Sequence, residues 1–199
     1  MYILVLDTET TGLQPKKHEI IEIAMVSYFI NDDGEWFLHK KFEEKIKPQR
    51  IEDAEPIALE VNGYSEENWQ NAKPFSKVLP DIKDIIEKSD LLLGQNLYFD
   101  LSFIQSEIKR ADEGQNIDYP PYIDTKSMAD PLVSQGWLDS SRLDYLCERL
   151  KIDFSGRAHT ALVDCERTFE VFQKLLEETD NSYELYTFEK PYRRKKRHL

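Results

Sequence analysis

The chain has 199 residues, of which 40% are hydrophobic and 12% aromatic, and its formal net charge is −12. This length and apolar content suit one domain with a sizeable core, and nothing in the composition suggests two. No apolar run approaches the length of a membrane span and the N-terminus lacks a signal-peptide pattern, so we expect a soluble, non-secreted, cytoplasmic protein without membrane contact. Cys147 and Cys165 lie in apolar helical patterns, which is typical of reduced core thiols.

The first half of the chain predicts strands and then helices. The expected strands cover residues 2–6, 19–30 and 36–43. A turn at residues 31–34 joins the last two, so we expect an antiparallel meander. A helix is predicted over residues 52–61, ending at the C-terminal signal Asn62-Gly63. A second helix follows Pro74, because apolar residues recur there at helical spacing.

The second half alternates strands and helices. A buried strand begins at Leu91 and turns, near Asn96, into a helix that runs to Arg110. A short strand at residues 122–123 precedes Asp124, which suits an N-cap of the next helix better than a metal ligand. The last two helices are expected at residues 142–151, capped by Ser140 or Ser141, and at about 160–178. This order predicts an α/β fold with a central mixed sheet and helices on its faces.

Acidic side chains gather where several of these elements begin or end. Asp7 and Glu9 follow the first strand, and because residues i and i+2 of a strand share a face, their carboxylates lie side by side, roughly 7 Å apart. Carboxylates this close must take up a proton, pair with bases or bind a metal. Alone, this pattern also fits a solvated strand end. Asp100 lies at the later strand-to-helix junction, and His159 and Asp164 lie at the start of the last long helix.

Three motifs resemble those of the DEDD exonucleases, in the branch that carries histidine in its last motif and includes proofreading subunits of bacterial DNA polymerases and ribonuclease T. They occur in the family's order and cover the chain to about residue 178. The motifs are D-T-E-T-T-G-L from Asp7, N-x-x-F-D-x-x-F from Asn96 to Phe103, and H-x-x-x-x-D from His159 to Asp164. One departure is Gln95, where many relatives have histidine.

The resemblance implies a ribonuclease H-like fold with helices on both faces of the sheet, and an active site where the first strand meets the last helix. It also implies that Asp7, Glu9, Asp100 and Asp164 hold two metal ions, with Asp7 bridging them. Four carboxylates without cysteine fit Mg²⁺ or Mn²⁺ better than zinc. His159 would take the proton from the attacking water, a task that suits histidine.

The family also implies substrate contacts. Backbone amides of the turn after Glu9 would meet the 3'-terminal sugar, and an apolar side chain of that turn would lie under a base. The candidate residues are Thr10, Thr11, Gly12, Leu13, Asn62, Asn96 and Phe103. Asn96 would support the site by hydrogen bonding. Phe103 would stack on the penultimate base, unless it is a core aromatic one turn after Phe99.

We therefore expect a metal-dependent 3'–5' exonuclease that releases nucleoside 5'-monophosphates from single-stranded ends, DNA in preference to RNA. The alternatives are an exoribonuclease that trims small RNAs, and a subunit that holds a polymerase or another protein partner. We expect an exonuclease domain over residues 1–180 and an extension over residues 181–199. The acidic charge opposes phosphate binding, but residues 190–199 hold six of the 26 basic residues and none of the 38 acidic ones. This basic tail suits either nucleic-acid binding, partner docking or a solubilising end.

Overall fold

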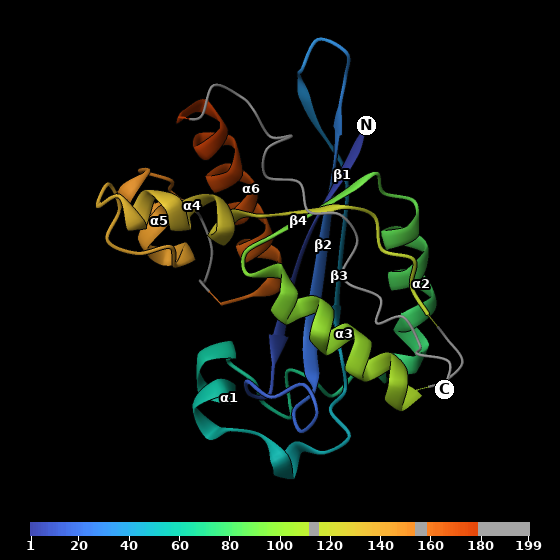
Figure 1. Cartoon of the computed structure of the whole chain (residues 1–199). Coiled ribbons are helices and arrows are strands. Elements are labelled where there is room, and N and C mark those ends of the chain that lie inside the picture. Colours follow the sequence, from blue (N-terminus) through green and yellow to red (C-terminus); the bar gives the residue numbers. More distant parts are fainter. Residues whose placement is uncertain (112–115, 154–158, 179–199) are drawn as a thin grey trace, which may run out of the picture.

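A computed structural model describes residues 1–111, 116–153 and 159–178 of the chain. Its centre is a five-stranded sheet in the order β3-β2-β1-β4-β5 (Figure 1). The strands are β1 (Tyr2–Thr10), β2 (Ile20–Ile30), β3 (Trp36–Lys45), β4 (Leu91–Gly94) and β5 (Tyr122–Asp124). The first three form the expected antiparallel meander, and β4 and β5 add parallel to β1. The mixed α/β sheet confirms the predicted ribonuclease H-like fold class.

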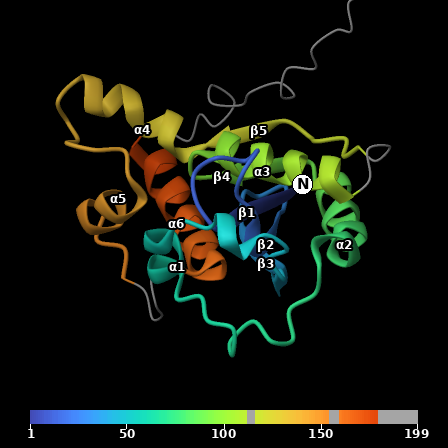
Figure 2. The ribbon, with the colours of Figure 1, turned by 90° about the horizontal axis from the view of Figure 1, so that it is seen from below.

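Helices cover both faces of the sheet. They are α1 (Pro56–Asn62), α2 (Phe75–Glu87), α3 (Leu97–Ala111), α4 (Thr125–Ser134), α5 (Leu143–Arg149) and α6 (Ala161–Glu178), with a short 3₁₀ turn at Ile51–Asp53. Figure 2 shows α4, α5 and α6 on one side of the sheet and α2 and α3 on the other. Among the helices of the described ranges, none combines the length and the apolar character that crossing a bilayer requires.

The alternation of side chains along β1 divides the core into two parts. Ile3 and Val5 pack on the α6 side, whereas Leu4 and Leu6 pack on the side of α2 and α3. Because successive side chains of a strand point to opposite faces, the odd-numbered residues that follow continue on the α6 side. β1 therefore directs the next odd-numbered side chain, that of Asp7, toward α6.

Two predicted boundaries differ from the structure, and a third agrees with it. β1 runs on to Thr10 rather than stopping before Asp7, because β2 pairs with it throughout. The helix predicted over residues 52–61 is a 3₁₀ turn followed by α1, since Pro56 favours an extended residue before it and a helix start at its own position. Gly63 ends α1 in the left-handed conformation, as predicted.

The predicted cap is confirmed for α4 and wrong for α5. Asp124 is the N-cap of α4, as predicted, and accepts the N–H of Lys126 at 3.0 Å. The predicted capping of α5 by serine is wrong, because Arg142 is its N-cap residue and caps it without a side-chain hydrogen bond. Ser140 Oγ accepts the Arg142 N–H at 3.1 Å and so holds the preceding turn. Both cysteines are buried free thiols, as predicted.

Candidate active site

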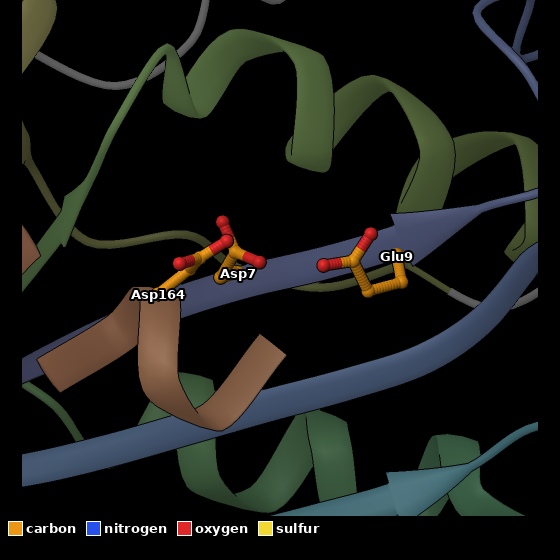
Figure 3. Close-up of side chains that lie close together, drawn as sticks. All are labelled: Asp7, Glu9 and Asp164. Atoms are coloured by element: carbon orange, nitrogen blue, oxygen red, sulfur yellow. The ribbon is translucent and has the colours of Figure 1, made fainter. Parts of the chain in front are cut away.

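Three carboxylates meet between β1 and the first turn of α6. One oxygen atom from each of Asp7, Glu9 and Asp164 can be chosen so that all three lie within 4.8 Å of one another. Figure 3 shows Asp7 and Glu9 on the same face of β1, with Asp164 reaching toward Asp7 from α6. The structure thus brings Asp7 and Glu9 together with Asp164, which lies 157 and 155 positions after them in the chain.

Asp100 joins this group from the start of α3. Its Oδ1 accepts hydrogen bonds from the backbone N–H of Thr8 at 2.9 Å and from the Thr8 hydroxyl at 2.6 Å. β4 pairs with β1 only as far as Val5, so the Asp100 carboxylate takes the N–H of Thr8 beyond the end of that pairing. These bonds fix Asp100 at the edge of β1, and its charge acts on the neighbouring Asp7.

The four carboxylates destabilise one another's charged forms. Burial, followed by the charges of Asp100, Glu9 and Asp164, raises the pKa of Asp7 well above its ordinary value. Burial and the charge of Asp164 raise the pKa of Glu9 to about 8. Burial raises the pKa of Asp100 to about 7 despite the opposing hydrogen bonds from Thr8. Groups arranged in this way hold protons unless cations neutralise them.

Among the described residues, a basic side chain contacts the cluster, and the sequence analysis missed it. Arg167 Nη1 lies 3.0 Å from Asp164 Oδ1, and its Nη2 lies 2.7 Å from Oδ1 of Asp144 on α5. Burial still raises the pKa of Asp164, although Arg167 opposes that shift. Residues three apart on a helix are neighbours, so the spacing of Asp164 and Arg167 was the available signal.

A second missed residue, Glu22, lies on β2 directly across from Glu9 in the strand register. Its Oε1 accepts the N–H of Ala161, the first residue of α6, at 2.9 Å. Burial raises the pKa of Glu22, and the Ala161 N–H opposes that shift. Glu22 therefore links the sheet to the start of the helix that carries Asp164.

His159 lies next to the described start of α6. Its side chain is exposed, and its positive charge would favour the ionised form of Asp164. Its backbone has a φ of 65°, in the left-handed region that few residues other than glycine adopt. A residue in this region carries local strain, which is common at functional sites. The location is consistent with the predicted general base.

The turn after Glu9 is held from several sides. The Asn62 amide donates to the Thr10 carbonyl at 2.9 Å, and the Thr10 hydroxyl donates to the Gly12 carbonyl at 2.8 Å. Thr11 Oγ1 accepts the N–H of Glu19 at 2.9 Å. Leu13, at the tip of the turn, is 72% exposed. The turn therefore has a fixed backbone and an exposed apolar side chain at its tip, and the substrate contacts expected of Thr10 to Leu13 stay a prediction.

Gly12 has room for no side chain. A Cβ atom on this residue would overlap the imidazole of His18, which is fully buried beneath the turn. The Nδ1 atom of His18 accepts the N–H of Gln14 at 3.0 Å, which fixes the orientation of the ring. His18 is therefore a third residue that the sequence analysis missed, and it shapes the turn from below.

The structure contradicts the predicted stacking of Phe103 on a base. Phe103 is 0% exposed and packs in the core, with its ring centroid 4.8 Å from that of Phe99. On a helix, a residue three positions after the buried Asp100 lies on the same inward face, which explains the error. Asn96 is exposed, and its N–H donates to Asp124 Oδ1 at 2.8 Å. Gln95 bonds to the Ser141 carbonyl and the Thr125 hydroxyl.

Comparison with known proteins identifies the class of this fold and site. The model of the exonuclease family matches residues 4–172. The chain belongs to this exonuclease family. It is a 3'–5' exonuclease of the DEDD type, in the branch that carries histidine, as the sequence predicted. Enzymes of this family depend on divalent metal ions, and the acidic cluster described above is of the kind that binds them.

Individual relatives differ in what they are named. Ribonuclease T of Shewanella denitrificans is 31% identical over 182 residues, which cover 86% of this chain and 78% of that protein. The DNA polymerase III subunit epsilon of Buchnera aphidicola is 31% identical over 177 residues, covering 85% and 68%. A PolC-type DNA polymerase III of Thermotoga petrophila is 33% identical over 175 residues, but this chain spans only 12% of its length.

Solved structures confirm the fold. The nuclease domain of 3'hExo bound to rAMP superposes with a TM-score of 0.69 at 20% identity, covering 90% of this chain and 94% of that one. Exonuclease X in complex with 5' overhanging duplex DNA gives a TM-score of 0.68 at 19% identity, covering 92% and 96%. The same architecture therefore occurs in structures with a ribonucleotide and with DNA.

Proposed function

We propose that this exonuclease uses two Mg²⁺ or Mn²⁺ ions to remove nucleotides from the 3' end of single-stranded nucleic acid, DNA in preference to RNA, and releases nucleoside 5'-monophosphates. The observation that carries the proposal is the meeting of Asp7, Glu9 and Asp164, with Asp100 beside Asp7. Like charges buried this closely are costly, and their arrangement is explained by cations that the substrate reaction needs.

The residues present fit such ions. All four side chains offer oxygen atoms, the ligands that Mg²⁺ and Mn²⁺ prefer. The charges of Glu9, Asp100 and Asp164 all act on Asp7, which is therefore central to the group. Asp7, Glu9, Asp100 and Asp164 would together hold the two ions, with Asp7 contributing to both as the family resemblance implies. When bound, two such ions orient the phosphate, activate water and stabilise charge on the leaving oxygen.

The chain's own groups then supply the proton transfer and the positioning. His159 takes the proton of the attacking water, since an exposed imidazole beside Asp164 has access to the substrate side of the site. The backbone of Gly12 contacts the 3'-terminal sugar, and Leu13 lies under the terminal base. Thr11, which the sequence analysis also placed at the sugar, is fully buried, and its N–H and carbonyl already bond to Glu19 and Glu55. Asn62 and Thr10 hold this turn in place through the hydrogen bonds described above. Asn96 supports the start of α3 through its bond to Asp124.

The decisive test is degradation of end-labelled oligonucleotides. DNA and RNA strands of identical sequence, labelled at the 5' end, would be incubated with the purified chain and Mg²⁺, Mn²⁺ or a chelator. We expect metal-dependent shortening from the 3' end, faster for DNA, with nucleoside 5'-monophosphates as products. Activity that persists in the chelator would contradict the metal-dependent mechanism. Cleavage at internal positions of the strand would contradict exonuclease action.

An exoribonuclease is the second candidate, because the ribonuclease T relative matches over most of its own length. The choice between DNA and RNA depends on contacts to the 2'-hydroxyl. Faster degradation of the RNA strand in the experiment above would favour this candidate. A polymerase partner is a third element of the proposal, supported by one relative named as a DNA polymerase III and another named as a subunit of DNA polymerase III. Co-purification with a polymerase subunit from the source cells would test it.

The predicted extension, residues 181–199, lies outside the described residues. We propose that its basic tail adds phosphate contacts to the exonuclease domain of residues 1–180. Deleting residues 190–199 should weaken binding to a single strand and lower the salt dependence by about 0.7 in log–log slope for each lost contact. Binding titrations at several salt concentrations measure this slope. An unchanged slope would contradict the phosphate contacts and favour a docking role for the tail.

A further inference from the structure

Glu22 is an acidic residue in an otherwise apolar stretch of sheet. Its neighbours along β2, Ile21 and Ile23, are fully buried, and Glu22 itself is 4% exposed. A carboxylate in such a place costs free energy unless it has hydrogen-bond partners. One partner is the N–H of Ala161. The reason for a carboxylate at this position therefore lies with the group to which it bonds.

Ala161 occupies a central place in the last motif. It is the first residue of α6 and lies between His159 and Asp164 in the chain. The first N–H groups of a helix have no partner within the helix, so an external acceptor decides how the helix begins. Glu22 supplies that acceptor from β2, and β2 is in turn paired with β1, the strand of Asp7 and Glu9.

The same bond thus connects both halves of the site. Asp7 and Glu9 are fixed by the sheet, whereas Asp164 and His159 depend on where α6 begins. Asp164 lies one turn inside the helix, where its N–H bonds to the Thr160 carbonyl at 3.0 Å. A displacement of the helix start relative to β2 would move both Asp164 and His159 away from Asp7.

We propose that Glu22 is a positioning residue of this active site, which through its hydrogen bond to Ala161 sets the places of Asp164 and His159 relative to Asp7 and Glu9. The inference rests on the proposed roles of Asp164 and His159 in the reaction. Glu22 acts through the hydrogen bond that its side chain accepts, so its reach and acceptor atom matter more than its charge.

Three substitutions separate the hydrogen bond from the charge. Glu22→Gln keeps the length and an acceptor oxygen but removes the charge. Glu22→Asp keeps the charge but ends one methylene short of Ala161. Glu22→Ala removes both. A positioning role predicts the order Glu ≈ Gln > Asp > Ala for kcat at saturating Mn²⁺, whereas a role of the charge predicts that Asp exceeds Gln.

The expected loss for Glu22→Ala is roughly 10- to 100-fold in kcat, the scale of a misplaced reactive group, with little change in KM. Mn²⁺ affinity, measured by isothermal titration calorimetry, should fall with kcat across the Asp and Ala variants, because Asp164 moves with the helix start. Glu43→Ala is the matched control, since it removes a nearby exposed carboxylate on β3 that acts on Glu22 only through its charge. That control should keep the parent rate.

Each outcome bears on the proposal. Parent-like kcat in folded Glu22→Ala, or a Gln variant as slow as the Ala variant, would overturn it. If Glu22→Ala fails to fold, the Gln and Asp variants still test the proposal. Gln is faster than Asp if the hydrogen bond matters, and Asp is faster than Gln if the charge matters. A parent chain without metal-dependent activity would instead refute the proposed function, before any Glu22 variant is compared.

Discussion

The α6-facing side of β1 has two halves that differ in chemistry but share one backbone and one strand register. Ile3 and Val5 are apolar and lie in the core beneath α6. Asp7 and Glu9 continue the same side of the same strand, yet they are carboxylates whose charged forms the surroundings disfavour. The apolar half stabilises the fold by burial, whereas the acidic half costs stability and provides the reaction. Stability and activity therefore reside in adjacent residues of one strand.

The sharpest contrast is expected between substitutions in the two halves. Asp7→Asn should lower kcat by about 10³-fold or more, because the metals would lose their shared ligand. In metal-free buffer the same change should raise the melting temperature, since it removes a buried carboxyl group that must either hold a proton or carry an unfavourable charge. Val5→Ala should do the reverse, losing about 2 kcal/mol of stability while the rate per folded molecule is retained. Kinetics and thermal melts on both variants measure this, and a destabilised Asp7→Asn would break the comparison.

The next largest effect on the rate is expected at His159, which lies beside the start of α6. His159→Ala should slow turnover by roughly 10²- to 10⁴-fold, the usual contribution of a positioned base. The pH dependence of the rate should change as well, because the group that accepts the proton of the attacking water is removed. Mn²⁺ binding should largely survive, because the four carboxylates remain. A variant with the parent rate and the parent pH profile would remove His159 from the mechanism.

Raising the pH and adding metal should have opposite effects on the stability of the folded chain. The folded-state pKa of Glu9 is raised from 4.5 to about 8 and that of Asp100 from 3.8 to about 7. Protons therefore bind the folded state more tightly than the unfolded one, and this stabilisation is complete below the unfolded pKa values and lost as pH rises through the folded ones. Metal-free melting temperatures should fall from about pH 5 to about pH 9 as these two groups ionise.

Added Mn²⁺ should reverse that fall, because it binds the ionised carboxylates of the folded state. The rise in melting temperature on adding Mn²⁺ should therefore grow with pH. Thermal melts with and without Mn²⁺ across the pH range test this directly. Glu9→Gln is the control, and its metal-free melting temperature should depend less on pH. A metal effect that is independent of pH would contradict the protonated state of the metal-free cluster.

The smallest effect on activity is expected at Asp124, an acidic residue like the proposed metal ligands that lies outside their cluster. Asp124 ends β5 and caps α4 through the Lys126 N–H, whereas Asp100 contacts β1 beside Asp7. Asp124→Asn should keep metal dependence and most activity, because asparagine caps nearly as well. Asp124→Ala should lose ~1 kcal/mol of stability with little change in the rate per folded molecule. Loss of catalysis in folded Asp124→Asn would mean that the proposed set of metal ligands is incomplete.

Much of this site was predictable because its ligands follow periodic elements. The two-residue period of β1 places Asp7 and Glu9 on one face. The resemblance to the family's motifs implies the parts of Asp100, His159 and Asp164. Glu22 was missed because its role depends on the register of β2 against β1 and on the docking of α6, neither of which is local. Arg167 was missed although its spacing from Asp164 is helical, because its second partner, Asp144, comes from another helix.

The errors in the sequence analysis have physical causes as well. Phe103 was assigned to the substrate because its motif position outweighed the helical period, which places it with the buried Asp100. The break before Pro56 was overlooked because a proline inside an apparent helix is also compatible with a helix that starts there. The role of His18 beneath Gly12 depends on close packing within one turn, which no residue pattern specifies.

The buried carboxylate cluster has a consequence for the amount of enzyme in a cell. If metal binding stabilises the folded chain, the fraction that is unfolded at any moment rises when free divalent metal is scarce. Unfolded chains are the substrates of cellular proteases, so a modest loss of stability can reduce abundance several-fold. Metal scarcity would then lower both the activity of each molecule and the number of molecules, and a supply restored late would find less enzyme to reactivate.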